Sequence, residues 1–84
     1  MPLHTRLARR LLALAEDFGA EVTASQEDLA VFVGATRESV NRQLQTWRRE
    51  GWIELSRNRV RVLQPARLWA PAGADGPETD EDAL

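Results

Sequence analysis

The sequence SQEDLAVFVGATRESVNRQLQTWRREG occupies residues 25–51 and contains the signals for two helices joined by a tight turn. Ser25 and Asp28 form the S-x-x-D variant of a capping box, which predicts the start of a helix. Gly34 is expected to end this helix, because glycine readily adopts the left-handed conformation found at helix ends. Thr36 is then placed to cap another helix only two residues later. Two helices with a short glycine-containing turn between them form a helix-turn-helix.

The second helix of this pair is predicted from about residue 36 to residue 50 and has two unlike faces. Val40, Leu44 and Trp47 lie one turn apart, which is typical of a helix buried on one side. The opposite face is polar throughout and carries Glu38, Arg42, Gln45 and Arg49. We therefore expect a helix that is anchored by its apolar stripe and presents a polar surface.

The residues after Gly51 change from helical periodicity to the two-residue period of a strand. A two-residue turn at Arg57-Asn58 defines the register of a hairpin. The facing pairs are then Ile53 with Val62, Leu55 with Val60, and Glu54 with Arg61. Asn58 tolerates the positive φ that such a turn requires, whereas Arg57 is a poor choice for the other central position. A hairpin beside a helix-turn-helix is the wing of a winged helix.

The flanking segments complete one domain over residues 1–70. A helix over residues 6–18, stopped by Gly19, is predicted from apolar residues at helical spacing. Its buried stripe consists of Leu7, Leu11, Leu14 and Phe18. A short extended piece follows at residues 21–24, and residues 64–69 are expected to add one short turn anchored by Leu68 and Trp69. The fold class is mainly α with a small β-hairpin: a winged helix-turn-helix with a three-helix core plus a wing.

The composition excludes several classes of function. A length of 84 residues allows one small domain. The chain has no cysteine and one histidine, His4, so we expect no disulfide, no metal site, no catalytic residues and no enzyme activity. No apolar run approaches the roughly 18 residues of a membrane helix. Because the first residues also differ from a signal peptide, we expect a cytoplasmic, nucleoid-associated protein without a membrane partner.

The formal net charge of −2 is an average over two unlike segments. Residues 71–84 carry five acids and no base, and are predicted to form an acidic, disordered tail. Residues 1–70 carry all eleven basic residues, every one an arginine, against eight acids. Seven of these arginines, but only three glutamates, fall within residues 36–61. The second helix of the helix-turn-helix and the hairpin therefore form a basic region, which suits an anionic partner such as nucleic acid.

The N-terminal residues of a recognition helix meet base edges in the major groove of DNA. Arginine donates to guanine O6 and N7, and a carboxylate accepts from cytosine N4, so an Arg-Glu-Arg set is compatible with reading G·C pairs. The residues expected to contact bases are Arg37, Glu38, Asn41 and Arg42. The alternative for Glu38 and Arg42 is an i, i+4 ion pair on a solvated helix.

Contacts with the DNA backbone are expected from two further groups of side chains. The first group lies near the helix starts and consists of Ser25, Gln26, Thr36 and Ser39. The second group consists of the hairpin arginines, Arg57, Arg59 and Arg61. Helix capping would also explain Ser25 and Thr36, and charges on a strand edge also prevent aggregation. We interpret the tryptophans as core residues rather than platforms for base stacking: Trp47, Trp52 and Trp69.

Residues 34–42, GATRESVNR, resemble the motif G-x-[ST]-R-E-[ST]-V-x-R in the C-terminal DNA-binding domain of the Crp/Fnr transcription regulators. Further matches, over about residues 5–69 in all, are RLA (6–8), LL (11–12), SQEDLA (25–30) and EGWIEL (50–55). The resemblance implies transcription regulation through double-stranded DNA, with Arg37, Glu38 and Arg42 reading bases of an inverted-repeat operator. It implies phosphate contacts by the group near the helix starts, and makes RNA polymerase a candidate partner.

This chain departs from the family in two respects. Trp47 stands where the family has an aliphatic residue, which bears on packing rather than on readout. The family's β-barrel sensor and long dimerisation helix do not fit into the five residues before Arg6. The chain is then either an excised domain or a free-standing reader. In both cases we expect no cyclic nucleotide, haem or iron–sulfur cofactor, no strong dimer, and weak, strongly salt-dependent binding of one half-site. GntR-type regulators come second as a family, because residues 56–60 lack the glycine-rich turn and aromatic residue of their wing.

Two other functions are compatible with the sequence. Winged helices also serve as protein-interaction modules, and an acidic tail can bind a basic surface on a transcription partner. Alternatively, residues 71–84 could fold over the basic region as an intramolecular mimic of DNA. Deleting the tail distinguishes the two, because only the second alternative predicts a rise in DNA affinity.

Overall fold

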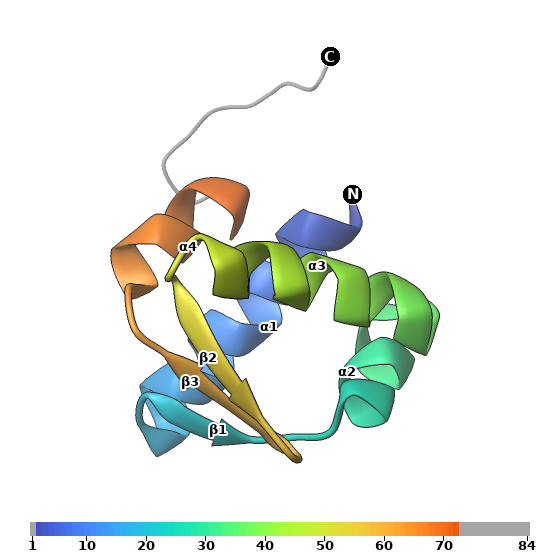
Figure 1. The fold of residues 1–84 in the computed structure, drawn as a ribbon, viewed down its shortest axis with the longest axis horizontal. Helices are drawn as coiled ribbons and strands as arrows, with labels where there is room; N and C mark the ends of the chain where they lie inside the picture. Colours follow the sequence, from blue (N-terminus) through green and yellow to red (C-terminus); the bar gives the residue numbers. More distant parts are fainter. Residues whose placement is uncertain (1, 73–84) are drawn as a thin grey trace.

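Four helices and a small antiparallel sheet make up residues 2–72, the part of the chain that this computed structural model describes (Figure 1). The elements in chain order are α1 (Leu3–Phe18), β1 (Glu21–Thr23), α2 (Gln26–Val33), α3 (Arg37–Arg49), β2 (Ile53–Ser56), β3 (Arg59–Val62) and α4 (Pro65–Ala72). The helix-turn-helix is α2 and α3, and the wing is β2 and β3. The predicted winged helix-turn-helix is thereby confirmed.

The wing has the register expected from its sequence. The observed Cα partners include Ile53 with Val62, Glu54 with Arg61, and Leu55 with Val60. Asn58 has a φ of 57°, and it is the only residue other than glycine with a positive φ among residues 2–72. Arg57 therefore keeps a backbone conformation that is ordinary for its type, and the turn does not require positive φ at both central positions.

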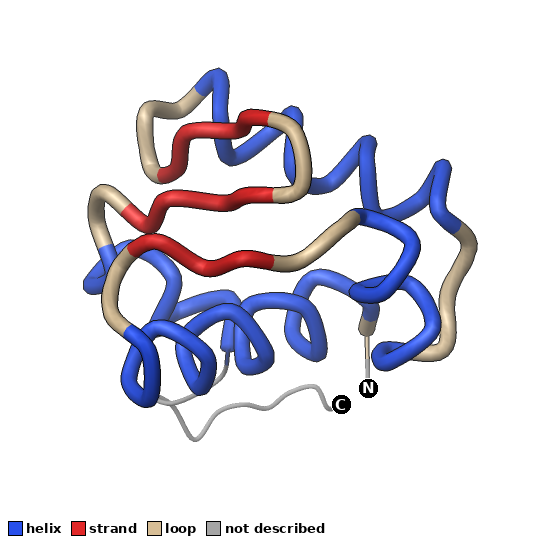
Figure 2. Tube along the Cα trace, turned by 90° about the horizontal axis from the view of Figure 1, so that it is seen from below, coloured by secondary structure: helices blue, strands red, loops and turns tan. Residues whose placement is uncertain are grey.

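The sheet contains a third strand that the sequence did not indicate. Its strand order is β1-β3-β2, and Figure 2 shows the three strands side by side. β1 pairs with the edge of β3 that the hairpin leaves open, with Val22 opposite Val60 and Glu21 opposite Arg61. The extended piece expected at residues 21–24 thus joins the wing to the start of the domain.

Side-chain caps begin both helices of the helix-turn-helix, as expected. Ser25 Oγ accepts a hydrogen bond from the backbone N–H of Asp28 at 3.0 Å. Thr36 Oγ1 accepts one from the backbone N–H of Ser39 at 3.1 Å. Gly34 ends α2 with a φ of 72°, a conformation that favours glycine. The turn between the helices is therefore fixed at both of its ends.

Thr36→Ala is expected to lower the free energy of unfolding by about 1 kcal/mol, because the first turn of α3 loses its cap. Urea denaturation followed by tryptophan fluorescence measures the change. Thr36→Ser keeps a hydroxyl at the same position and serves as the matched control. Equal losses in the two variants would show that the cap is not the cause.

The core is apolar and lies between the helices and the sheet. No polar or charged side chain within residues 2–72 is buried. The largest fully buried side chains are Leu7, Leu11, Leu29, Leu44, Ile53, Leu68, Val22, Val40 and Val60. Trp47 is also buried, so the predicted apolar stripe of α3 is confirmed.

The predicted core is wrong at the end of the first helix. Phe18 is 76% exposed, and Leu14 is only partly buried. Phe18 is the last residue of α1, and Gly19, with a φ of 95°, turns the chain away into β1. The apolar residues at helical spacing therefore continue for one turn beyond the part of α1 that packs against the core.

The C-terminal segment also differs from the prediction. α4 extends over eight residues instead of one short turn, and includes Pro71 and Ala72, which were predicted to belong to the tail. Leu68 is fully buried, as expected, but Trp69 is 48% exposed and is not a core anchor. The rest of the predicted tail, residues 73–84, lies outside the described residues.

Candidate nucleic-acid interface

The outward face of α3 carries the side chains predicted to read bases. Arg37, Glu38 and Arg42 are exposed, and Asn41 is partly buried. Within residues 2–72, the first three side chains form no hydrogen bond or ion pair, so the alternative Glu38–Arg42 ion pair is not formed. The amide of Asn41 is engaged differently, because its Oδ1 accepts a long hydrogen bond of 3.5 Å from Gln45 Nε2. Three of the four predicted side chains are thus available to a ligand.

The buried apolar stripe of α3 fixes the position of this helix on the domain. Val40 and Leu44 are completely buried, and Trp47 is 3% exposed. These residues lie on the face of the helix opposite to the exposed residues. The polar face therefore cannot turn inward without exposing the apolar stripe to solvent. The core therefore presents the polar face of α3 as a rigid surface.

A hollow of about 330 Å³ lies where the wing tip approaches the starts of α2 and α3. The backbone N–H of Ala24 donates to the carbonyl of Asn58 at 3.1 Å, which ties the tip to the chain just before α2. Side chains lining the hollow include Ser25, Gln26, Glu27, Arg37, Arg57 and Arg59. We call this feature the wing-tip hollow. Three of its side chains are arginines and one is an acid, so its formal charge favours an anion.

The three wing arginines do not have the same surroundings. Arg57 lies in the turn at the wing tip and forms no ion pair with any residue of the described range. Arg59 and Arg61 instead lie on β3 next to Glu21 of β1, with guanidinium-to-carboxylate distances of 3.4 and 3.8 Å. Arg61 also lies 3.9 Å from Glu54 of β2. Glu21 was missed by the sequence analysis because its proximity depends on the unexpected pairing of β1.

The hydroxyl groups predicted to contact phosphates have roles within the fold. Thr36 Oγ1 donates to Ser39 Oγ at 2.9 Å while it accepts from the backbone of Ser39. Ser25 caps α2 and also lines the wing-tip hollow. Capping is thus confirmed for Ser25 and Thr36, and their phosphate contacts stay predictions.

Two arginines of α1 contact the C-terminal part of α2. Arg6 Nε donates to the carbonyl oxygen of Val33 at 2.8 Å. The guanidinium of Arg10 lies 3.6 Å from the ring centre of Phe32, in a cation–π arrangement. These contacts help to hold the helix-turn-helix on α1, and the sequence analysis predicted neither of them.

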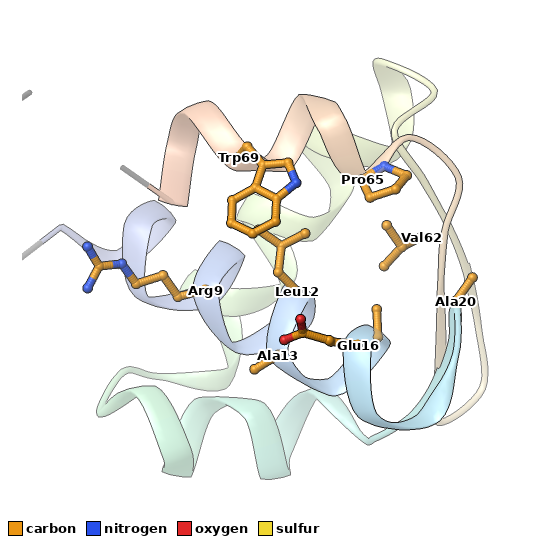
Figure 3. A pocket seen from close by; sticks show the side chains of 9 residues that line it. Arg9, Leu12, Ala13, Glu16, Ala20, Val62, Pro65 and Trp69 are labelled. Carbon is orange, nitrogen blue, oxygen red and sulfur yellow. The ribbon is translucent and has the colours of Figure 1, made fainter. Parts of the chain in front are cut away.

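A second hollow, of about 560 Å³, lies between α1, α4 and β3 (Figure 3). Leu12 from α1, Val62 from β3 and Trp69 from α4 line it, and its wall is mostly apolar. It shares no lining residue with the wing-tip hollow. The apolar hollow and the basic surface are therefore separate features.

The described part of the chain has neither a membrane span nor a cluster of metal-binding side chains. None of its four helices is long and apolar enough to cross a membrane. Residues 2–72 also contain no group of three or more His, Cys, Asp or Glu side chains positioned to hold a metal ion.

Comparison with known families gives a match over most of this chain. The model described as the Crp-like helix-turn-helix domain matches residues 5–70. The CRP-like cAMP-activated global transcriptional regulator of Mycobacterium tuberculosis is 39% identical over 71 residues, which cover 75% of this chain and 32% of the relative. The transcriptional regulator LdrP of Thermus thermophilus is 39% identical over 79 residues, covering 86% of this chain and 40% of that protein. The chain thus spans well under half the length of these relatives.

Solved structures show the same architecture. A CRP-family transcriptional regulator of Thermus thermophilus superposes with a TM-score of 0.79 at 38% identity, covering 87% of this chain and 41% of that one. The Catabolite Activator Protein of the same organism gives a TM-score of 0.79 at 29% identity, covering 88% and 35% of the two chains.

Proposed function

This chain belongs to the Crp-like helix-turn-helix family, and we propose that it binds double-stranded DNA with sequence preference in the regulation of transcription. One observation carries the proposal. An exposed Arg-Glu-Arg set, without partners in residues 2–72, lies at the start of a helix whose other face is locked into the core. Polar groups at the start of a firmly anchored helix suit insertion of that helix into the major groove of DNA.

The proposed binding mode places α3 in the major groove. A helix of 13 residues is about 20 Å long, and the major groove, about 12 Å wide, accepts an α-helix. Arg37 and Arg42 would donate to guanine edges, and Glu38 would accept from cytosine. Asn41 would contribute at the flank once its weak contact with Gln45 is exchanged for a base.

The wing-tip hollow is proposed to hold the sugar-phosphate backbone beside that groove. Arg57 supplies positive charge, and Ser25 and Gln26 supply donors at the start of α2. Such contacts orient the protein on the duplex without reading its sequence.

Selection from a pool of random duplexes, followed by anisotropy titrations of the selected and scrambled duplexes, tests the proposal. We expect a recurring motif and a measurable preference for it. The absence of binding to any duplex at low salt would overturn the proposal. Capture of a protein partner by the same chain would then support the protein-interaction alternative.

Arg57→Ala is expected to weaken binding to selected and scrambled duplexes by the same factor. Losing one phosphate contact should also reduce the slope of log affinity against log salt by about 1. Titrations at several salt concentrations measure both effects. Arg67→Ala, which removes an exposed arginine from α4, is the matched control. A loss confined to the selected duplex would contradict a backbone role for Arg57.

A further inference from the structure

Glu21 lies between two arginines on the outward face of the sheet. Its Oε2 atom is 3.4 Å from Arg59 Nη1 and 3.8 Å from Arg61 Nη2. β1 creates this arrangement, because the antiparallel register sets Glu21 directly opposite Arg61 and two positions from the partner of Arg59. A single carboxylate thus contacts both arginines of β3.

These ion pairs cancel most of the charge that the wing would otherwise present. Arg59 and Arg61 are counterbalanced by Glu21 and by Glu54, which approaches Arg61 from the opposite strand at 3.9 Å. Arg57 is then the wing arginine without an ion pair among the described residues. The basic character expected from the sequence is therefore reduced by the fold on this face.

The Arg59 side chain belongs both to the face of the sheet and to the wing-tip hollow. It pairs with Glu21 on the sheet and also lines the wing-tip hollow together with Arg37 and Arg57. A phosphate bound in that hollow would compete with the Glu21 carboxylate for the same guanidinium. The Arg59 and Glu21 side chains are 57% and 46% exposed, and ion pairs at such exposure are weak enough to exchange.

We propose that Glu21 weakens the contact between the wing and the DNA backbone. It does so by holding the side chains of Arg59 and Arg61 on the face of the sheet. Glu21 is a positioning residue in this proposal, since it acts through the two arginines and touches no DNA itself. The proposal rests on the DNA-binding function proposed above. Glu21 would set the sequence-independent part of the affinity for DNA, which is the part that depends on salt.

The test is Glu21→Gln in the full 84-residue chain, with a selected and a scrambled duplex titrated over a range of salt concentrations. Glutamine keeps the size of the side chain and removes its charge. Both duplexes should bind about 2- to 5-fold more tightly near 0.1 M salt, the range corresponding to loss of a surface ion pair. The slope of log affinity against log salt should steepen by about 1 as one more phosphate is neutralised.

Two controls separate this effect from a change in net charge. Glu16→Gln makes the same charge change at an exposed position on α1, and should alter affinity and slope much less. In a chain carrying both Arg59→Ala and Arg61→Ala, the substitution of Glu21 should bring no gain beyond that of Glu16→Gln. Circular dichroism checks that every variant remains folded.

The outcomes distinguish the two proposals. If the unmodified chain binds no duplex at low salt, the proposed function fails. If it binds, but Glu21→Gln matches Glu16→Gln or keeps its gain without the two arginines, the role assigned to Glu21 is overturned while DNA binding stands.

Discussion

Leu44→Ala is expected to lower the free energy of unfolding by about 2–5 kcal/mol, the range found for truncating a buried leucine. Leu44 is completely buried on α3, and alanine would leave a cavity between that helix and the rest of the core. Small domains of this size are stable by only about 4–13 kcal/mol, so the variant should lose a large part of its stability and unfold at a much lower urea concentration. Urea denaturation monitored by tryptophan fluorescence measures the loss.

Val31→Ala provides the comparison for Leu44, because Val31 is 79% exposed on α2. Substitutions of exposed side chains usually change stability by no more than about 0.5 kcal/mol. Similar losses in the two variants would mean that the α3 stripe does not anchor the helix. The rigid presentation of the polar face would then lose its basis.

Arg42→Ala is expected to remove most of the preference for a selected duplex while binding to scrambled DNA changes little. A bidentate contact with guanine is worth about 1–3 kcal/mol of discrimination, which corresponds to roughly 5- to 150-fold in relative affinity. Arg42 is exposed, and its guanidinium has no partner in residues 2–72 that must be displaced before it can reach a base. Competition titrations with selected and scrambled duplexes give the ratio directly.

The same titrations with Arg67→Ala control for the loss of one positive charge, since Arg67 is exposed on α4 and does not line the wing-tip hollow. A parallel fall in affinity for both duplexes in Arg42→Ala would assign Arg42 to the backbone. Unchanged preference would remove it from the proposed base-reading set.

The features that the sequence predicted correctly are those with local causes. A cap such as Thr36 acts within three residues, and the hairpin register follows from a two-residue turn and the alternation of side chains. The apolar stripe of α3 is likewise visible in the spacing of three residues. Exposure of Arg37, Glu38 and Arg42 then follows, because they lie on the other side of the same helix.

What the sequence did not predict depends on contacts between distant segments. Glu21 and Arg59 are 38 positions apart, and nothing near either residue indicates that β1 completes the sheet. The packing of α4 on α1 through Leu68 is another such contact, and α4 is longer than the one turn that local signals predict. Phe18 was wrongly predicted to be buried. Periodicity shows which face of a helix is apolar, but not at which residue the rest of the core stops packing against that face.

The strand order has a mechanical consequence for the helix-turn-helix. β1 precedes the helix-turn-helix and β3 follows it, so their pairing closes the intervening segment into a loop. The entropy of that closure is lost once, when the sheet forms, rather than on each encounter with a duplex. A force that separates the wing from α2 and α3 would have to act against the hydrogen bonds between β1 and β3, so this pairing resists that separation.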